Sequence, residues 1–236
     1  MTVNNPSIIL VRPQLSENIG MVARVMHNFG LKNLIIVSPR TDWLNDKSIN
    51  AAKKANKIIK NVKVYDNLNM AIGKFNYVIA TTNRKRYLEK VSINDFKIFK
   101  EKLDTYKKVA IVFGPENSGL SNEDLRLSDI IFTINTSKKS NSLNLSHAVS
   151  IISYKIFELR NLKSKKYIKK IDNTLEKDQL SKYFNFLFKN LENKNFFNPK
   201  EKSASMKNNI YAIFTKSSMT KKELQTLWGI TKKLIK

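Results

Sequence analysis

Residues 109–120 have the sequence VAIVFGPENSGL, in which five apolar residues pass directly into a turn that contains two glycines. The apolar part, Val109–Phe113, is typical of a strand that is buried on both faces of a parallel sheet. The turn behind it brings Gly114, Glu116 and Gly119 close together in sequence. Ligands of α/β proteins bind where the strands end, so this turn is the first candidate for a functional site.

Apolar runs of the same kind recur before and after this stretch, with helical patterns between them. The further predicted strands are Ser7–Val11, Asn33–Val37, Val62–Tyr65, Tyr77–Ala80 and Ile130–Ile134. The helices predicted from three- and four-residue apolar spacing are Asn18–Phe29, Lys47–Ile59, Ile93–Leu103, Asn122–Leu127 and Ser146–Leu159. This alternation predicts an α/β domain with a parallel sheet over residues 1–160.

The last third of the chain has a different character. Residues 161–176 are rich in lysine and lack periodicity, which predicts a linker. Behind it, three amphipathic patterns predict helices at Lys177–Leu191, Lys202–Phe214 and Thr220–Ile235. Residues 177–236 are therefore expected to form a small all-α extension.

The chain of 236 residues carries 43 Lys and Arg against 19 Asp and Glu, a net charge of +24. Such a charge attracts polyanions, of which nucleic acid is the commonest. An AT-rich genome offers another explanation, because 36 of the 43 basic residues are lysine. Residues 160–236 hold 19 basic and six acidic side chains, so the extension is the most basic part. A DNA-binding or architectural protein remains an alternative that rests on charge alone.

Several classes of protein are excluded or disfavoured by what the sequence lacks. With no cysteine and only His27 and His147, disulfide scaffolds, thiol catalysis and the usual metal centres are not expected. There is no apolar run long enough to span a membrane and no recognisable signal peptide, so we expect a cytoplasmic protein. Neither a G-x-G-x-x-G after the first strand nor a P-loop is present, which disfavours the common nucleotide sites.

Three polar segments lie where predicted strands or loops enter helices: SENIGMVAR at 16–24, FGPENSGL at 113–120 and NSLNLSH at 141–147. Each has an ordinary explanation when taken alone. Ser16 or Asn18 can cap a helix, the glycines can form a turn, and Asn144 or Ser146 can cap the helix that follows. Their occurrence together, and in this order, calls for a common explanation.

Together the segments resemble the three motifs of the SpoU family of RNA ribose 2′-O-methyltransferases, within the SPOUT superfamily. The motifs are N-x-G-x-x-x-R at Asn18, Gly20 and Arg24, F-G-x-E-x-x-G-L at 113–120, and S-x-N-x-S at Ser142, Asn144 and Ser146. The resemblance implies a knotted α/β fold, in which the end of the domain is threaded into a deep trefoil knot. It further implies use of S-adenosylmethionine, release of S-adenosylhomocysteine, and a homodimer formed through the knot region.

Within this family the chain looks most similar to the TrmJ type of tRNA methyltransferase, whose SPOUT domain is followed by a helical extension. That resemblance implies methylation of the ribose of a cytidine or uridine at nucleotide thirty-two, in the tRNA anticodon loop. One alternative is a SpoU enzyme for another tRNA position or for ribosomal RNA. A second is a catalytically inactive SPOUT protein that only binds RNA.

The resemblance also assigns candidate site residues. The expected cofactor contacts are Thr81, Thr82, Asn83, Gly114, Ile134, Asn141, Ser142 and Leu143. The expected catalytic group is Arg24, Asn18, Glu116, Ser142 and Asn144. No metal ligand is expected. The basic triplet Arg84, Lys85 and Arg86 is expected to contact RNA phosphates, because it follows the cofactor-binding turn directly and contains two of the seven arginines.

The family's proposed role for Arg24 is that of a general base. A guanidinium stays protonated at any physiological pH, and a nearby phosphate would hold its proton more tightly. We therefore expect Arg24 to stabilise the negative charge that develops on the ribose oxygen and to bind the adjacent phosphate.

Overall fold

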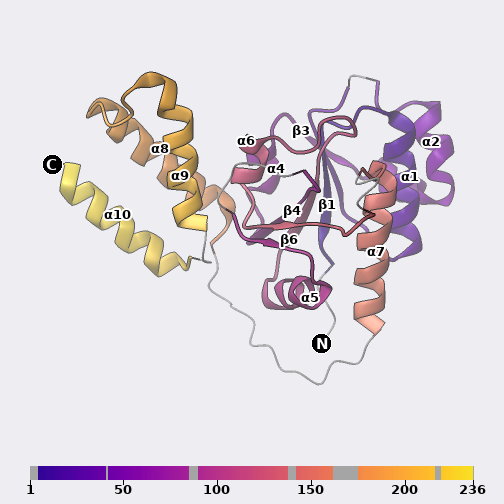
Figure 1. Ribbon diagram of the computed structural model, residues 1–236. Coiled ribbons are helices and arrows are strands. Elements are labelled where there is room, and N and C mark those ends of the chain that lie inside the picture. Colours follow the sequence, from indigo (N-terminus) through magenta and orange to yellow (C-terminus); the bar gives the residue numbers. More distant parts are fainter. Residues whose placement is uncertain are drawn as a thin grey trace.

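A computed structural model describes residues 5–40, 42–84, 90–137, 142–161, 175–215 and 219–235. Its centre is a sheet of seven parallel strands in the order β3-β2-β1-β6-β4-β7-β5 (Figure 1). The strands are β1 (Ser7–Val11), β2 (Leu34–Val37), β3 (Lys63–Tyr65), β4 (Tyr77–Thr81), β5 (Ser92–Ile93), β6 (Val109–Phe113) and β7 (Ile130–Phe132). The predicted α/β class and the parallel sheet are thereby confirmed.

Helices cover both faces of this sheet, which explains why its strands are almost continuously apolar. Ile8 and Leu10 of β1 face one core, whereas Ile9 and Val11 face the other. The first core is covered by α1 (Ser16–Asn28), α2 (Asp46–Ala52), α3 (Asn56–Lys60), α5 (Phe96–Thr105) and α7 (Leu145–Asn161). The second is covered by α4 (Leu68–Ile72) and α6 (Asn122–Arg126).

Two of the predicted helices are wrong in detail. The pattern at Lys47–Ile59 is interrupted at Lys53, which has φ 51° and begins the short 3-10 helix η1 (Lys53–Ala55) between α2 and α3. Ile93 belongs to β5 rather than to a helix, because α5 begins at Phe96, where the Asp95 side chain accepts a hydrogen bond from the Lys97 amide. The short elements α4 and β5 were not predicted, since two to five residues are too few for a periodic pattern.

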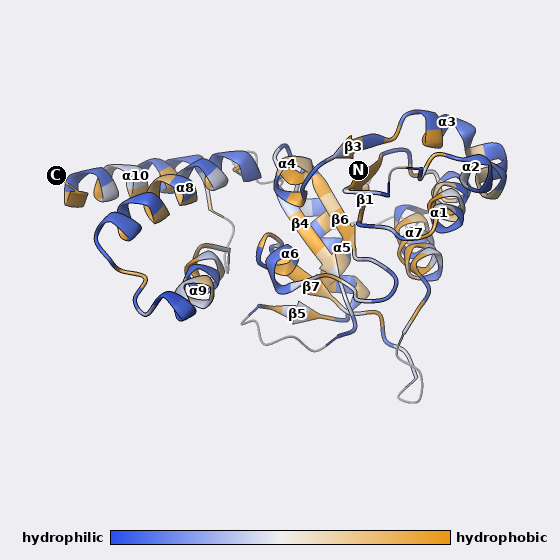
Figure 2. Cartoon of the chain, turned by 90° about the horizontal axis from the view of Figure 1, so that it is seen from above, coloured by the Kyte–Doolittle hydropathy of each residue, from blue (hydrophilic) through white to orange (hydrophobic). Residues whose placement is uncertain are grey.

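The extension consists of α8 (Lys177–Asn193), the 3-10 helix η2 (Lys200–Lys202), α9 (Ser203–Thr215) and α10 (Lys221–Ile235). Its own core is aromatic, centred on Tyr183, Phe184 and Phe188. We call the sheet, together with the helices that cover it, the sheet domain. The three helices of the extension lie beside this domain (Figure 2). Two helices of the extension contact the sheet domain: α8 packs against α4, and α9 packs against α6. Of the predicted linker at 161–176, residues 162–174 lie outside the described residues.

Gly20 shows how the first motif contributes to packing. It is buried on α1, where α2 crosses so closely that a Cβ atom at Gly20 would lie 2.1 Å from the Ser48 carbonyl oxygen and 2.8 Å from the Ala51 Cβ. A side chain at this position therefore cannot be accommodated without moving backbone atoms. The glycine sets the distance between α1 and α2, and so helps to hold α1 where Asn18 can reach the site described next.

Candidate active site

A cavity of about 230 Å³ opens at the carboxyl ends of the central strands. Its walls come from the turns that follow β4, β6 and β7 and from the entry into α7. The lining residues are Thr81, Thr82, Asn83, Arg84, Phe113, Gly114, Pro115, Glu116, Gly119, Phe132, Ile134, Thr136, Ser142, Leu143, Leu145 and Ala148. Aromatic and aliphatic walls with a few polar groups at the rim are typical of a site for an organic ligand.

Most of the residues expected to contact a cofactor line this one cavity. These residues are Thr81, Thr82, Asn83, Gly114, Ile134, Ser142 and Leu143. Asn141 lies outside the described residues. Segments far apart in the sequence are thus brought to a single hollow, and their joint placement is what a ligand site requires.

The turn behind β6 depends on both of its glycines. Gly119 has φ +64°, a left-handed conformation that favours glycine, and its amide donates to the Pro115 carbonyl over 2.9 Å. The turn then folds back onto Gly114, where a Cβ atom would lie 2.3 Å from the Leu120 nitrogen and 2.4 Å from the Gly119 carbonyl carbon. The backbone itself therefore forms this wall of the cavity.

The turn behind β4 is tied to both neighbouring strands. The Thr81 hydroxyl donates to the Val112 carbonyl over 2.8 Å, and the Thr133 hydroxyl donates to the Thr82 carbonyl over 3.0 Å. Further out, the Asn83 side-chain amide donates to the Thr136 hydroxyl over 3.1 Å. These bonds hold the three walls of the cavity at fixed positions relative to one another.

A chain of polar contacts joins the three sequence motifs. The Glu116 carboxylate accepts from the Asn18 side chain over 2.7 Å and from the Gln14 amide over 2.9 Å. Asn18 in turn accepts from the Asn144 side chain over 3.4 Å, and Asn144 accepts from the Ser146 amide over 2.8 Å. The amide and carboxylate groups of the first, second and third motifs therefore orient one another.

This series of contacts also corrects the expected cap of α1. The N-cap residue of α1 is Leu15, so neither Ser16 nor Asn18 holds that position. Leucine has no polar side chain, and the helix therefore has no side-chain cap of its own. Instead the Glu116 carboxylate, from the other side of the cavity, accepts from the backbone amides of Gln14 and Leu15. At the third motif, by contrast, Asn144 does accept from the first turn of α7.

Arg24 lies apart from this cavity. It is exposed on α1 and is not among the lining residues, whereas Asn18, six positions earlier, is buried and points at Glu116. Six residues correspond to about 600° of helical rotation, so the two side chains leave the helix in different directions. Exposed apolar side chains are found on α1 and α7 as well, namely Met21, Tyr154 and Phe157, together with the exposed His27 of α1.

Of the basic triplet, only Arg84 is described. Its guanidinium donates to the Asn117 carbonyl and its aliphatic part passes near Gly119, so it covers the rim of the cavity. Lys85 and Arg86 lie outside the described residues. The structure thus places one of the three at the site.

Several residues around the site were not anticipated from the sequence. Phe113 and Phe132 end the strands β6 and β7 and line the cavity, as their strand-end positions could have indicated. Arg12, which follows β1, pairs with the buried Asp124 of α6. That ion pair had no sequence signal, because it joins residues 112 positions apart that belong to no motif.

Neither a metal centre nor a membrane span is found in the part of the chain that the structure describes. Within it, no group of three or more His, Asp or Glu side chains could hold a metal ion. Likewise, no described helix is both long and apolar enough to cross a membrane.

Comparison with known proteins shows which proteins the chain resembles. The family model of the SpoU rRNA Methylase family matches residues 5–154. The tRNA (cytidine-2′-O-)-methyltransferase TrmJ of Methanocaldococcus jannaschii is 39% identical over 154 residues, which is 64% of this chain and 66% of that relative.

Among solved structures, the crystal structure of TrmJ from Z. mobilis ZM4 has a TM-score of 0.88 and 32% identity, over 98% of this chain and 99% of that one. The SpoU methyltransferase AviRb from Streptomyces viridochromogenes, solved in complex with the cofactor AdoMet, has a TM-score of 0.52 at 20% identity. The match covers 68% of this chain and 62% of AviRb, and it shows that the two proteins have the same fold.

Proposed function

Because the chain belongs to the SpoU rRNA Methylase family, we propose that it transfers a methyl group from S-adenosylmethionine to the ribose 2′ oxygen of a tRNA. The substrate position we propose is nucleotide thirty-two of the anticodon loop, as a cytidine or uridine. The observation that carries the proposal is the cavity lined by the second and third motif segments, to which the first motif is bonded through the contacts of Asn18 with Glu116 and Asn144. The likeness to TrmJ of Z. mobilis along nearly the whole chain supports the tRNA substrate.

The cavity fits the proposed cofactor. The close turn at Gly114 exposes backbone groups that can bind the polar parts of a nucleoside and an amino acid. Phe113, Phe132, Ile134 and Leu145 supply apolar walls for the adenine ring. When bound, S-adenosylmethionine supplies a methyl group on a positively charged sulfur, and S-adenosylhomocysteine is the product.

The chain's own residues act by positioning and by charge. We infer that Glu116, Asn18 and Asn144 keep the three segments in register, with Ser142 at the rim toward the ribose. The ribose oxygen must approach in line with the bond that breaks, so orientation supplies much of the rate. As that oxygen loses its proton to water, the Arg24 guanidinium stabilises the developing negative charge and holds the neighbouring phosphate.

The position of Arg24 is best explained by a homodimer. Arg24 does not line the cavity of its own chain, and the helices α1 and α7, which pack against each other, expose the apolar side chains of Met21, Tyr154 and Phe157. Pairing of two copies through this area would cover it and bring Arg24 to the partner's cavity. We also propose the family's trefoil knot at the end of the sheet domain, which is supported by the contacts of Thr136 with the turn after β4 and of Asn144 with helix α1.

The test of this function is methyl transfer from labelled S-adenosylmethionine to tRNA, followed by mapping of the methylated nucleotide. We expect a 2′-O-methyl group at nucleotide thirty-two, in the cytoplasmic tRNA pool. A methyl group found elsewhere on tRNA, or on ribosomal RNA, would show that the proposed target nucleotide is wrong. Tight RNA binding without any methyl transfer would instead support an inactive RNA-binding protein.

A second prediction concerns the basic extension. Replacing the exposed Lys221, Lys222 and Lys232 of α10 by glutamine should weaken tRNA binding and flatten its salt dependence, by about 0.7–0.9 in the log–log slope for each phosphate that is no longer neutralised. Fluorescence anisotropy at several salt concentrations measures the slope. The matched control replaces the exposed Lys53, Lys54 and Lys57 beside α2, on the other side of the sheet domain. Equal losses in both variants would show that the charge acts without regard to position.

A further inference from the structure

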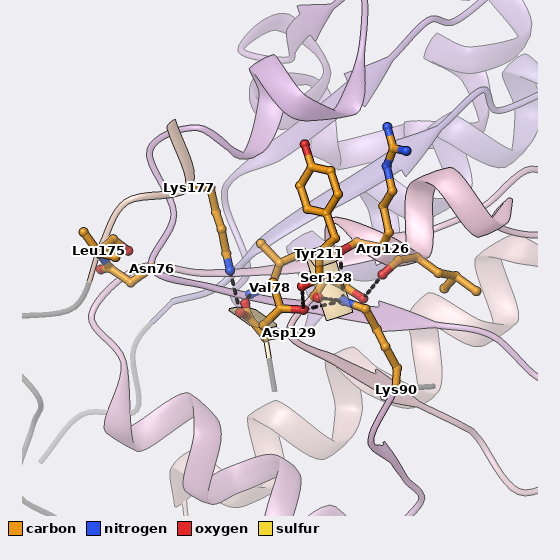
Figure 3. A network of polar contacts seen from close by, with 11 residues as sticks. Asn76, Val78, Lys90, Arg126, Ser128, Asp129, Leu175, Lys177 and Tyr211 are labelled. Carbon is orange, nitrogen blue, oxygen red and sulfur yellow. Dashed lines mark hydrogen bonds and ion pairs between the residues drawn. The ribbon is translucent and has the colours of Figure 1, made fainter. Parts of the chain in front are cut away.

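A buried polar joint connects the sheet domain to the extension (Figure 3). The Lys90 amino group, just before β5, donates to the carbonyl of Arg126 over 2.9 Å and to the carbonyl of Ser128. It also donates to the hydroxyl of Thr215 over 3.3 Å. Arg126 ends α6 of the sheet domain, whereas Thr215 ends α9 of the extension. One amino group thus bridges the two parts of the chain.

A second lysine, which belongs to the extension, lies at the same contact between the extension and the sheet domain. Lys177, the first residue of α8, forms an ion pair with Asp129, and the two side chains are only 11% and 9% exposed. Asp129 also accepts from the Val78 amide of β4 over 2.7 Å. We call Lys90, Asp129, Lys177 and Thr215 the joint.

Backbone bonds lie directly beside the joint. The amides of Lys177 and Asp178 donate to the carbonyls of Phe75 and Gly73, each over 3.1 Å. The start of α8 is therefore bonded to the loop that precedes β4, the strand whose carboxyl end forms a wall of the cavity.

The polar contacts of the joint fix the orientation of the extension relative to the sheet domain, which a purely apolar contact would not do. An apolar contact allows two surfaces to slide, whereas each N–H of a lysine must find an acceptor in one direction. The Lys90 amino group lies within hydrogen-bond distance of three acceptors, two in the sheet domain and one in the extension. Burying a lysine costs free energy, so its placement here is better explained by the orientation it specifies than by stability.

The joint also lies near the active site in the chain. Arg84 at the rim of the cavity is six residues before Lys90, and Val91 accepts a backbone hydrogen bond from Ile131 of β7 over 3.0 Å. β7 in turn ends at Phe132, a lining residue. The segment that holds the extension is thus continuous with two walls of the cavity.

We propose that Lys90 is a positioning residue for the methyl transfer: through Thr215 it holds the extension in one orientation, so that RNA bound by the extension is presented to the cavity. This inference rests on the proposed function. Without the joint the extension stays tethered to the sheet domain, but the effective concentration of bound RNA at the cavity falls.

The pH dependence of docking gives an independent readout. Burial lowers the pKa of Lys90 from 10.5 to about 7, while the charge of Asp129 raises it and that of Lys177 lowers it. Arg126 and Tyr211 are the other titratable side chains at this contact. If the extension lifts away, Lys90 returns toward its ordinary pKa and takes up a proton. Docking should therefore strengthen as the pH rises above about 7, and be weaker below it.

The chain offers a direct way to lock the docked state. A Cβ atom at Gly73 would lie 3.4 Å from the Cβ of Asp178, close to the separation found in disulfides, and Gly73 has an ordinary helical backbone with φ −50°. The chain has no cysteine, so Gly73→Cys with Asp178→Cys introduces the only pair. The rate of disulfide formation in this pair reports docking, and the oxidised pair enforces it.

The experiment compares Lys90→Met with wild type, each with and without the cysteine pair. We expect Lys90→Met to lower kcat/KM for full-length tRNA about tenfold, mainly through KM, and to leave cofactor affinity by calorimetry unchanged. Disulfide formation should be slower in Lys90→Met than in wild type, and the ratio of the wild-type rate to the Lys90→Met rate should rise as the pH increases above about 7. This ratio removes the pH dependence of the thiols themselves, which is common to both proteins. Oxidation of the pair should restore kcat/KM to within twofold, and dithiothreitol should abolish that rescue. The exposed Lys74→Met, beside the joint, is the matched control and should behave as wild type.

Thr215→Val gives a second variant that leaves Lys90 and its other two acceptors in place. It should lower kcat/KM in the same direction with a smaller effect. The inference would be overturned if kcat/KM were unchanged in Lys90→Met, or if the locked pair did not rescue the loss. In either case methyl transfer by the wild-type protein would still support the proposed function. Wild-type protein that docks normally but transfers no methyl group to tRNA would overturn the proposed function, and this inference with it.

Discussion

Replacing Gly114 by alanine should weaken binding of S-adenosylmethionine at least 100-fold. The added methyl group would lie 2.3 Å from the Leu120 nitrogen and 2.4 Å from the Gly119 carbonyl carbon. Both are backbone atoms of the same tight turn, so the clash can be relieved only by opening the wall of the cavity. Isothermal titration calorimetry measures the affinity, and circular dichroism checks that the sheet domain remains folded.

The chain contains a matched control for this change. Gly229 on α10 has no atom within 4 Å of its added Cβ, so Gly229→Ala makes the same substitution without a clash. It should leave cofactor affinity unchanged and stabilise the helix slightly. Wild-type affinity in Gly114→Ala would mean that the turn is not part of the cofactor site.

The second large effect is expected for Arg24. Arg24→Ala should lower kcat for methyl transfer at least 100-fold, on the order of 3 kcal/mol, since removal of one preformed charge-stabilising donor typically costs this much. The affinity for S-adenosylmethionine should not change, because the proposed role of Arg24 is to act on the ribose oxygen and the phosphate of the RNA and not on the cofactor. Single-turnover methyl transfer at saturating cofactor and tRNA measures the effect.

Two companion variants decide what the guanidinium does. Arg24→Lys retains the positive charge but loses the two-pronged geometry, so recovery of most activity would favour plain charge. Lys32→Ala removes an exposed positive charge beyond the carboxyl end of α1 and should leave kcat unchanged. Full activity of Arg24→Ala would refute any catalytic role for this residue.

Much of the fold was predictable because the sheet is buried on both faces. Runs such as SIILV and VAIVF have no other stable location, and their predicted bounds match β1 and β6. Prediction failed where a local interaction outweighed periodicity. The break at Lys53 occurs inside a sequence with acceptable helical spacing, and the β5 pairing of Ile93 depends on β7, a strand much further along the chain.

The candidate site, too, was predictable in some parts and not in others. Gly114, in the turn after β6, was predicted from a motif that describes a short, contiguous stretch, whereas Thr81, Thr82 and Asn83 after β4 lie in no motif and were predicted from the family resemblance alone; all of them line the cavity. The side-chain contacts between these stretches, such as Glu116 with the amide of Gln14, were not predictable, because they depend on how α1 packs. The joint at Lys90 had no sequence signal at all: a lone lysine among 36 carries no information until its acceptors are known.

The opposite placement of α1 and the extension on the two faces of the sheet has a consequence for the size of the substrate. The helix that carries Arg24 covers one core, whereas α8 and α9 rest on the helices that cover the other. An RNA that touches the extension and a ribose at the cavity in the same encounter must pass over the rim where the strands terminate. We therefore expect full-length tRNA to be a better substrate than a hairpin cut down to the target loop, because only an RNA that contacts both places gains from both contacts.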